Sequence, residues 1–203
     1  VISNCHFEPA FGSTGQLQGQ HLLVGNRGLL QKHRVSIAHA ESKLSTLEQL
    51  GQTVVLIAID YRLVGILSFK NKMKAGSRNA LIRLRAANID TVLLSGDSQL
   101  TTDALAAQLN IQRFRAEVPQ RDRGRAVEAL REEGHLRAMI GRSPLDDAAM
   151  TQADVGILMN APAARPRANA ALLVNASPST AAHALLLPQQ LRERVFHLDF
   201  GVR

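Results

Sequence analysis

The chain has 203 residues, 45% of them hydrophobic, and a formal net charge of +7. This hydrophobic content is enough to build a core in one large or two small domains. The apolar runs fall well short of the ~20 residues that cross a bilayer, so the sequence predicts no membrane-spanning segment in this chain. The single cysteine, Cys5, excludes an internal disulfide and is typical of a reducing compartment, so the predicted location is the cytoplasm.

Much of the positive charge lies in residues 113–125, "RFRAEVPQRDRGR". A basic surface suits nucleic acid, an anionic membrane or phosphorylated ligands. Aromatic residues make up only 3% of the chain, which argues against stacking on single-stranded nucleic acid. A solvated basic surface with no dedicated partner is the simpler interpretation, and nucleic acid is the weakest of the predicted partners.

The first 70 residues have the pattern of a small α+β unit. The sequence "QHLLVGNRGLL", residues 20–30, predicts a strand, a Gly-Asn turn and the start of a short helix, and a glycine-rich stretch precedes it. Residues 51–69 contain two apolar, β-branched runs on either side of Asp60, Tyr61 and Arg62. Such a pair of runs about a polar turn predicts a β-hairpin.

From residue 74 onward, strands and helices alternate. The predicted helices are residues 77–88, 99–110 and 123–134, and the predicted strands are residues 90–96, 136–141, 154–159 and 170–174. Strands separated by single helices predict an α/β domain with a parallel sheet and right-handed crossovers. We therefore expect three parts, residues 1–68, 69–188 and 189–203.

Two loops at the carboxyl ends of predicted strands carry groups suited to phosphate chemistry. The loop "LLSGDS" places Ser95, Gly96 and Asp97 before a helix, and the loop "MIGRSPLDD" includes Asp146. A hydroxyl and carboxylates on such loops, with Arg123 as a cation, suit phosphoryl transfer. The alternative is structural, with Asp97 and Asp146 as helix N-caps and Ser95 as a turn residue.

Several local patterns occur in one order along the chain: "GNRGLL", "GQTVVLIAIDYRLVGILSF", "LLSGDS", "AEVPQRDR" and "MIGRSPLDDAAMTQADVGILM". In this order they resemble the nucleotide-binding and phosphorylation domains of heavy-metal-transporting P-type ATPases, over nearly the whole chain. The resemblance implies a haloacid-dehalogenase-like, Rossmann-like parallel sheet with helices on both faces and a small, partial α+β nucleotide-binding domain. It also implies a copper-type pump, a place at the cytosolic face of the membrane, and residues 189–203 as a segment leading toward a transmembrane helix.

The phosphorylation site departs from the family pattern. The family's DKTGT motif, whose aspartate takes the phosphate, is absent from this sequence. Ser95, Gly96 and Asp97 match the phosphate-binding TGDN loop, and Arg123 stands near the position of a lysine that neutralises the phosphoryl group. We therefore expect a remnant phosphate site that does not form the aspartyl phosphate.

The metal loop departs as well. Asp146 matches the second aspartate of the family's GDGxND pattern, but Arg142 stands where the resemblance implies a magnesium ligand. A guanidinium repels Mg²⁺ and removes one oxygen from a coordination shell that needs about six. We expect magnesium binding to be lost, with Arg142 pairing with Asp146 or Asp97 in place of the ion.

The resemblance also implies nucleotide contacts. Gly12 and Gly15 match a glycine-rich element that lets ATP approach the backbone, and Gly25 and Asn26 belong to "GNRGLL". Other positions of the glycine-rich element are replaced, so the expected ATP affinity is weak.

The missing motif belongs to a central strand, and a central strand is paired on both sides. We expect the rest of a P-type ATPase, or another chain, to supply that strand, and the isolated chain to be marginally stable or oligomeric. Two functions follow: a degenerate ATPase region, or a pseudoenzyme that binds a nucleotide, a phosphorylated partner or a related pump.

Overall fold

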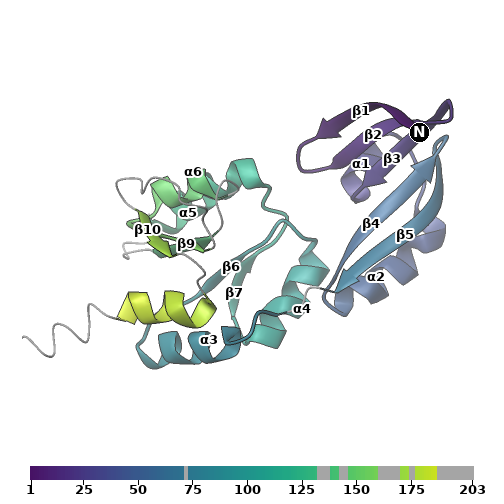
Figure 1. The fold of residues 1–203 in the computed structure, drawn as a ribbon. Coiled ribbons are helices and arrows are strands. Elements are labelled where there is room, and N and C mark those ends of the chain that lie inside the picture. The colour runs from purple at the N-terminus through teal and green to yellow at the C-terminus, as the bar shows by residue number, and fades with distance from the viewer. Residues whose placement is uncertain (71–72, 132–137, 142–145, 160–169, 174–176, 187–203) are drawn as a thin grey trace, which may run out of the picture. The chain divides into compact units, whose positions relative to one another are not determined.

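The computed structural model describes residues 1–70, 73–131, 138–141, 146–159, 170–173 and 177–186 (Figure 1). The chain divides into two compact units, of which the first comprises Val1–Lys72, Leu93–Asn110 and Phe114–Glu117. The second comprises Met73–Val92, Ile111–Arg113 and Val118–Arg203. None of the helices in the described ranges is long and apolar enough to cross a membrane. The expected C-terminal part, residues 189–203, lies outside the described residues.

An antiparallel sheet in the order β1-β2-β3-β4-β5 forms the centre of the first unit. Its strands are β1 (Ile2–Glu8), β2 (Gly12–Leu17), β3 (Gln20–Gly25), β4 (Gln52–Ile59) and β5 (Arg62–Lys70). Between β3 and β4 lie α1 (Arg27–Lys32), the short 3-10 helix η1 (Ala38–Ala40) and α2 (Glu41–Gln49). The predicted strand, turn and helix over residues 20–30 are confirmed, and so is the hairpin over residues 51–69.

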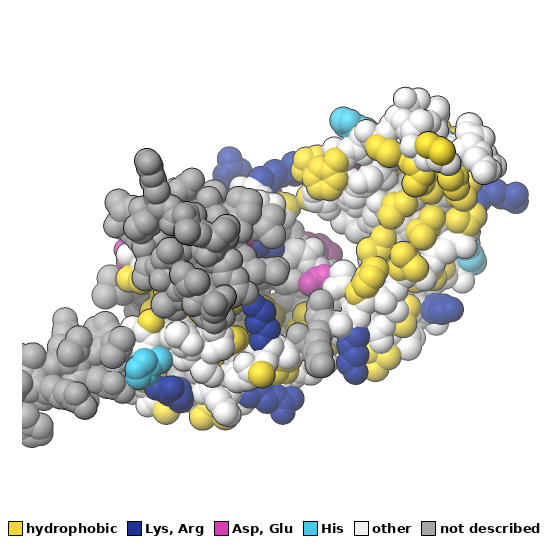
Figure 2. All heavy atoms as spheres, in the orientation of Figure 1, with side chains coloured by type: hydrophobic (Ala, Val, Ile, Leu, Met, Phe, Trp, Pro, Cys, Tyr) yellow, Lys and Arg dark blue, Asp and Glu magenta, His cyan; other side chains and the backbone are white. Residues whose placement is uncertain are grey.

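One face of this sheet carries the hydrophobic core of the first unit. Leu29 and Leu30 of α1 and Leu44 of α2 are fully buried in one cluster with Leu23 of β3 and Leu56 of β4. Successive side chains of a strand point to opposite faces, so the neighbours of these core residues face the other way. That other face keeps apolar side chains exposed, and Figure 2 shows hydrophobic atoms in a band over β4 and β5.

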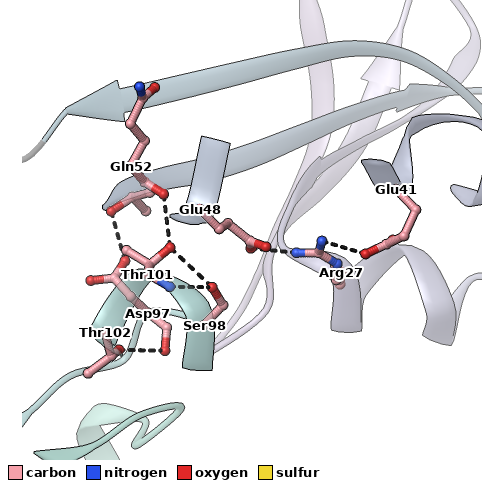
Figure 3. Close-up of polar contacts among 9 residues, drawn as sticks. Arg27, Glu41, Glu48, Gln52, Asp97, Ser98, Thr101 and Thr102 are labelled. Atoms are coloured by element: carbon pink, nitrogen blue, oxygen red, sulfur yellow. Dashed lines mark hydrogen bonds and ion pairs between the residues drawn. The ribbon is translucent and has the colours of Figure 1, made fainter. Parts of the chain in front are cut away.

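An ion pair with a buried carboxylate joins α1 to α2 (Figure 3). The Arg27 guanidinium donates to the Glu48 carboxylate and, at 2.7 Å, to Glu41 Oε1. Glu48 is 4% exposed, whereas Glu41 is exposed. Burial by itself lowers the pKa of Arg27, but the hydrogen bonds to Glu41 and Glu48 outweigh it, so this pKa lies above its ordinary value. Arg27 therefore stays charged and compensates the buried Glu48 carboxylate.

Helix α4 (Gln99–Leu109) belongs to the first unit and packs against α2. It follows the short strand β6 (Val92–Leu94), which pairs with β7 (Arg113–Arg115). Gly51, just after α2, has a φ of +72°, and a Cβ added there would stand 3.1 Å from Gln108 Nε2 of α4. Glycine suits this position because it adopts a positive φ without strain. The predicted helix over residues 99–110 is confirmed.

In the second unit, α3 (Ser77–Ala86) packs against the helical residues 178–186. Ala80 and Leu84 of α3 share a small buried cluster with Ala182. Gly76, which precedes α3, has a φ of +82°, and its carbonyl accepts a hydrogen bond from Ser179 Oγ at 3.3 Å. These contacts join two segments of the unit that are far apart in the sequence.

A parallel sheet in the order β10-β9-β8 lies in the same unit. Its strands are β8 (Ala138–Gly141), β9 (Val155–Met159) and β10 (Ala170–Leu173). Helix α5 (Arg123–Arg131), preceded by the 3-10 helix η2 (Gln120–Asp122), packs on α6 (Asp147–Gln152). Ala149 and Met150 of α6 and Ile157 of β9 are buried.

The expected α/β class is confirmed, but the sheets differ from the expectation of one dominant parallel sheet. The largest sheet is antiparallel, because short turns connect most of its strands and parallel neighbours need long crossovers. The parallel strands β8, β9 and β10 form a sheet separate from that of β6 and β7. A continuous parallel sheet needs a strand hydrogen-bonded to both β6 and β8, and none of the strands in the described ranges makes both pairings.

Candidate functional site

Polar groups of the loop after β6 form hydrogen bonds with one another. Ser95 Oγ donates to Asp97 Oδ2 at 2.9 Å, and the Asp97 N–H donates back to Ser95 Oγ at 3.1 Å, which closes a turn around Gly96. The N-cap of α4 is Ser98, whose hydroxyl accepts from the Thr101 N–H at 3.4 Å. The interpretation of Asp97 as the helix cap is therefore wrong, because the shorter Ser98 side chain next to the helix takes that position.

Thr53 and Thr101 tie this loop and α4 to β4, and Figure 3 shows the contact of Thr101 with Gln52. Thr53 Oγ1 donates to Asp97 Oδ1 at 2.8 Å, so each oxygen of the Asp97 carboxylate accepts from a hydroxyl. Thr101, 1% exposed, donates its hydroxyl to the Gln52 carbonyl at 2.9 Å. Asp97 thus anchors the loop to the antiparallel sheet, and a phosphate bound to the Ser95 hydroxyl would have to displace one of these hydrogen bonds.

Replacing Thr53 with valine is expected to lower the free energy of unfolding by about 1–3 kcal/mol, because the partly buried Asp97 carboxylate loses a donor. Urea denaturation measures the change, and hydrogen exchange is expected to become faster at residues 95–98. Thr46→Val is the control, because the exposed Thr46 hydroxyl donates within α2, to the Ser42 carbonyl at 2.9 Å. Equal effects of the two substitutions would contradict the anchoring role of Thr53.

A second polar contact joins the first residue of α5 to the residue before α6. Arg123 Nη1 donates to Asp146 Oδ1, and Asp146 is 6% exposed. The Asp146 carboxylate packs on Gly141, where an added Cβ would lie 2.6 Å from Oδ2. Asp146 occupies the N-cap position of α6, but its side chain makes no capping hydrogen bond. Its carboxylate accepts from Arg123 instead. The prediction of Asp146 as a helix N-cap is therefore correct for its place in the sequence, but the side chain does not cap the helix.

In the Arg123–Asp146 pair, one carboxylate oxygen, Oδ1, accepts from a guanidinium. Mg²⁺ requires near-octahedral oxygen coordination, to which a guanidinium contributes no ligand. Among the described residues, no group of three or more His, Cys, Asp or Glu side chains is placed to hold a metal. Arg142 lies outside the described residues, and so do its expected contacts with Asp146 or Asp97.

The glycines expected at a nucleotide lie where β2 meets β3. Gly12 pairs with Gly25, and a Cβ added to Gly12 would lie 2.2 Å from the Val24 carbonyl oxygen. A Cβ on Gly25 would lie 2.3 Å from the Phe11 carbonyl oxygen, and Gly15 is also buried. The close approach of the two strands therefore requires glycine at positions 12 and 25, whether or not a ligand binds.

Asn26 fixes the same turn from the start of α1. Its Oδ1 accepts from the Leu29 N–H at 3.1 Å, which makes it the N-cap, and its Nδ2 donates to the Ala10 carbonyl at 2.8 Å. Its backbone N–H donates to the Phe11 carbonyl at 2.9 Å. Asn26 therefore holds the residues before Gly12 against α1 and shapes the turn that the family resemblance assigns to the nucleotide.

The structure brings the expected site residues together as two separate pairs. Ser95 contacts Asp97 in the first unit, and Arg123 contacts Asp146 in the second. Thr53 and Thr101 were missed from the sequence, because their partners lie 44 and 49 residues away and no local pattern marks such contacts.

Residues 7–154 match the model of a hydrolase family, the haloacid dehalogenase-like hydrolases. The chain belongs to this family. This haloacid dehalogenase-like chain is 33% identical over 158 residues to a copper-exporting P-type ATPase of Staphylococcus haemolyticus (strain JCSC1435), which covers 78% of the chain and 20% of the relative. It is 34% identical over 148 residues to a silver exporting P-type ATPase of Salmonella typhimurium, covering 73% of the chain and 18% of the relative.

These relatives confirm the resemblance to heavy-metal P-type ATPases, and the chain spans about a fifth of their length. A solved structure of the catalytic domain of the CPx-ATPase CopB-B, which concerns conformational changes upon nucleotide binding, has a TM-score of 0.54 and 18% identity. The match covers 89% of this haloacid dehalogenase-like chain and 58% of that one. At this level of identity the likeness concerns the fold.

Proposed function

We propose that this chain is the nucleotide-binding and phosphorylation region of a copper-type, heavy-metal-exporting P-type ATPase, in a form that does not make the aspartyl phosphate. Its similarity to copper-exporting and silver exporting pumps supports the pump class. Arg142, which stands where the family pattern has a magnesium-binding aspartate, supports the loss of magnesium-dependent phosphoryl transfer. In this proposal residues 1–68 form the nucleotide-binding part, residues 69–188 the phosphorylation part, and residues 189–203 lead toward a transmembrane segment, all at the cytosolic face of the membrane.

The observation that carries the proposal is the Arg123–Asp146 pair. A buried carboxylate needs a compensating positive charge, and here a guanidinium supplies it where the family pattern would use a divalent cation. The Arg123 guanidinium thus compensates the Asp146 carboxylate from within the protein. Ser95 and Asp97 bond to each other, which leaves the remnant phosphate loop satisfied as well. Both features favour weak ATP binding that does not depend on magnesium.

The proposed partner is the remainder of a P-type ATPase, or a chain that supplies a further parallel strand. Strand β8 is an edge strand among the described residues, because β9 is its only neighbour there. An added strand on this edge would extend the parallel sheet toward the Rossmann-like arrangement with helices on both faces. Without it, we expect the isolated chain to be marginally stable or oligomeric.

Calorimetric titration with ATP, with and without Mg²⁺, tests the proposed function. We expect weak binding of equal strength in both conditions and no release of phosphate. Tight binding that requires magnesium, accompanied by ATP turnover, would contradict it. Absence of any ATP binding would favour the second candidate, a non-catalytic module that recognises a phosphorylated partner or a related pump through its basic surface.

A further inference from the structure

The loop between β6 and α4 contains two kinds of hydrogen-bond donor. The Ser95 hydroxyl and the Asp97 N–H are used inside the loop, in the turn around Gly96. The N–H groups of Gly96 and Ser98 donate to no partner among the described residues, and they lie just before α4. The proposed function takes this loop as a remnant phosphate site. Whatever occupies the Ser95 hydroxyl therefore controls that site.

The Asp97 carboxylate lies beside these donors and is held from outside the loop. Its Oδ2 accepts from Ser95 Oγ at 2.9 Å, and its Oδ1 accepts from Thr53 Oγ1 of β4 at 2.8 Å. The Asp97 carbonyl also accepts from the Glu117 N–H at 2.9 Å and from Thr102 Oγ1 of α4 at 3.4 Å. All five residues belong to the first unit. Contacts from β4, from α4 and from the residues after β7 thus fix this carboxylate against the Ser95 hydroxyl.

The hydroxyls that donate to Asp97 are neutral, so they leave its negative charge in place. In the ranges that the structure describes, no cation forms an ion pair with Asp97. Backbone groups of Arg115 and Glu117 bond to the loop, but both of these side chains are exposed and they carry opposite charges. Of the charges that these contacts place, the Asp97 carboxylate is therefore the one nearest to the Ser95 hydroxyl.

An anion on the Ser95 hydroxyl would have to compete with this carboxylate. Its oxygen would lie about 2.8 Å from Ser95 Oγ. Since Asp97 Oδ2 is 2.9 Å from the same atom, the two negative groups would be within about 6 Å of each other. At an effective dielectric constant of about 40, repulsion at that distance lowers affinity about tenfold. The single hydroxyl proton also cannot serve both acceptors.

We propose that Asp97 is an autoinhibitory carboxylate, which Thr53 holds on the Ser95 hydroxyl and which keeps phosphate off the loop. Release of the Thr53–Asp97 hydrogen bond lets the carboxylate turn away, and the Ser95 hydroxyl and the N–H groups of the loop then become available to an anion. The inference rests on the proposed function in taking this loop as the phosphate site. It adds a contact through which β4, a strand of the proposed nucleotide-binding part, regulates that site.

Inorganic phosphate, titrated into the full chain by calorimetry at low salt, is the probe. We expect Asp97→Asn to bind phosphate about tenfold more tightly than the native chain, because the side chain keeps its shape and loses its charge. Asp103→Asn is the matched control. Asp103 is exposed on α4, and its substitution changes the net charge by the same amount. This control should bind phosphate as weakly as the native chain does.

Two substitutions of Thr53 test the hold on the carboxylate without changing any charge. Thr53→Val removes the donor to Asp97 Oδ1 and should raise phosphate affinity about threefold, near the lower end of what one hydrogen bond contributes. Thr53→Ser keeps a hydroxyl and should bind as the native chain does. Hydrogen exchange at residues 95–98 should slow when phosphate is added to Asp97→Asn, which locates the bound ion on this loop. If Asp97→Asn does not fold, the two Thr53 variants decide the test.

Equal phosphate affinity of the native chain, Asp97→Asn and Thr53→Val would overturn the proposal. Absence of phosphate binding in both variants, or an equal gain in Asp103→Asn, would do the same. A gain in Asp97→Asn without one in Thr53→Val would overturn the part assigned to Thr53. Magnesium-dependent ATP turnover by the native chain would contradict the proposed function instead and would leave these relative affinities unchanged, so the two failures are distinguishable.

Discussion

Replacing Arg27 with alanine is expected to lower the free energy of unfolding by about 3–5 kcal/mol, because it leaves the buried Glu48 carboxylate without its compensating charge. Glu48 is 4% exposed, and Arg27 is the partner that the structure gives it. Urea denaturation measures the loss.

Two controls distinguish the effect of the buried Arg27–Glu48 ion pair on stability from the effect of an exposed ion pair. Glu41→Ala removes the exposed partner of Arg27 and should cost about 0–1 kcal/mol. Replacing Arg27 and Glu48 together with methionine removes both charges, so the double variant should be far more stable than Arg27→Ala. A double variant as unstable as the single one would show that packing, and not the unpaired carboxylate, causes the loss.

Replacing Asp146 with alanine is expected to cost about 3–5 kcal/mol as well, because the mostly buried Arg123 guanidinium loses its counter-charge. Arg123 Nε is already buried without a hydrogen-bond partner among the described residues, so the guanidinium has little alternative compensation. Thermal or urea unfolding of the chain without added metal measures the loss. This result would identify Asp146 as a structural partner of a cation within the protein.

Asp122→Ala provides a matched control, since this carboxylate is exposed and lies 3.6 Å from Arg121 Nε. Its removal should change stability by less than about 1 kcal/mol. The competing role for Asp146 is that of a magnesium ligand. An Asp146→Ala variant that keeps its stability but loses magnesium-dependent ATP binding would establish that role and contradict the proposed function.

Local patterns predicted much of the fold. The hairpin of β4 and β5 and the helix α4 follow from β-branched runs, turn residues and helical spacing, all of which act between near neighbours. Strand β1 was not predicted as an element, because its side chains are almost all exposed and its sequence, "ISNCHFE", lacks an apolar alternation. Helix α2 was missed because few of its residues are buried, among them Leu44 and Glu48, and the sequence does not mark a buried glutamate.

The candidate site was predicted in part. The loops containing Ser95, Asp97 and Asp146 were found because small and acidic residues follow apolar strands, and their order along the chain pointed to the family. The anchor at Thr53 was not found, since a threonine at the start of a strand has no distinguishing local context. Gly12 and Gly25 were read as nucleotide contacts, yet the strand packing already requires both of them.

By itself, the sequence determined the family and the alternation of strands and helices, because both depend on patterns among neighbouring residues. Only the tertiary structure decided which groups stabilise each carboxylate: two neutral hydroxyls donate to Asp97, Arg123 pairs with Asp146, and Arg27 pairs with Glu48. Such pairings depend on how helices and strands pack across tens of residues of chain. Because burial makes an unpaired charge costly, the packing selects the partner that is within reach, and sequence spacing does not reveal it.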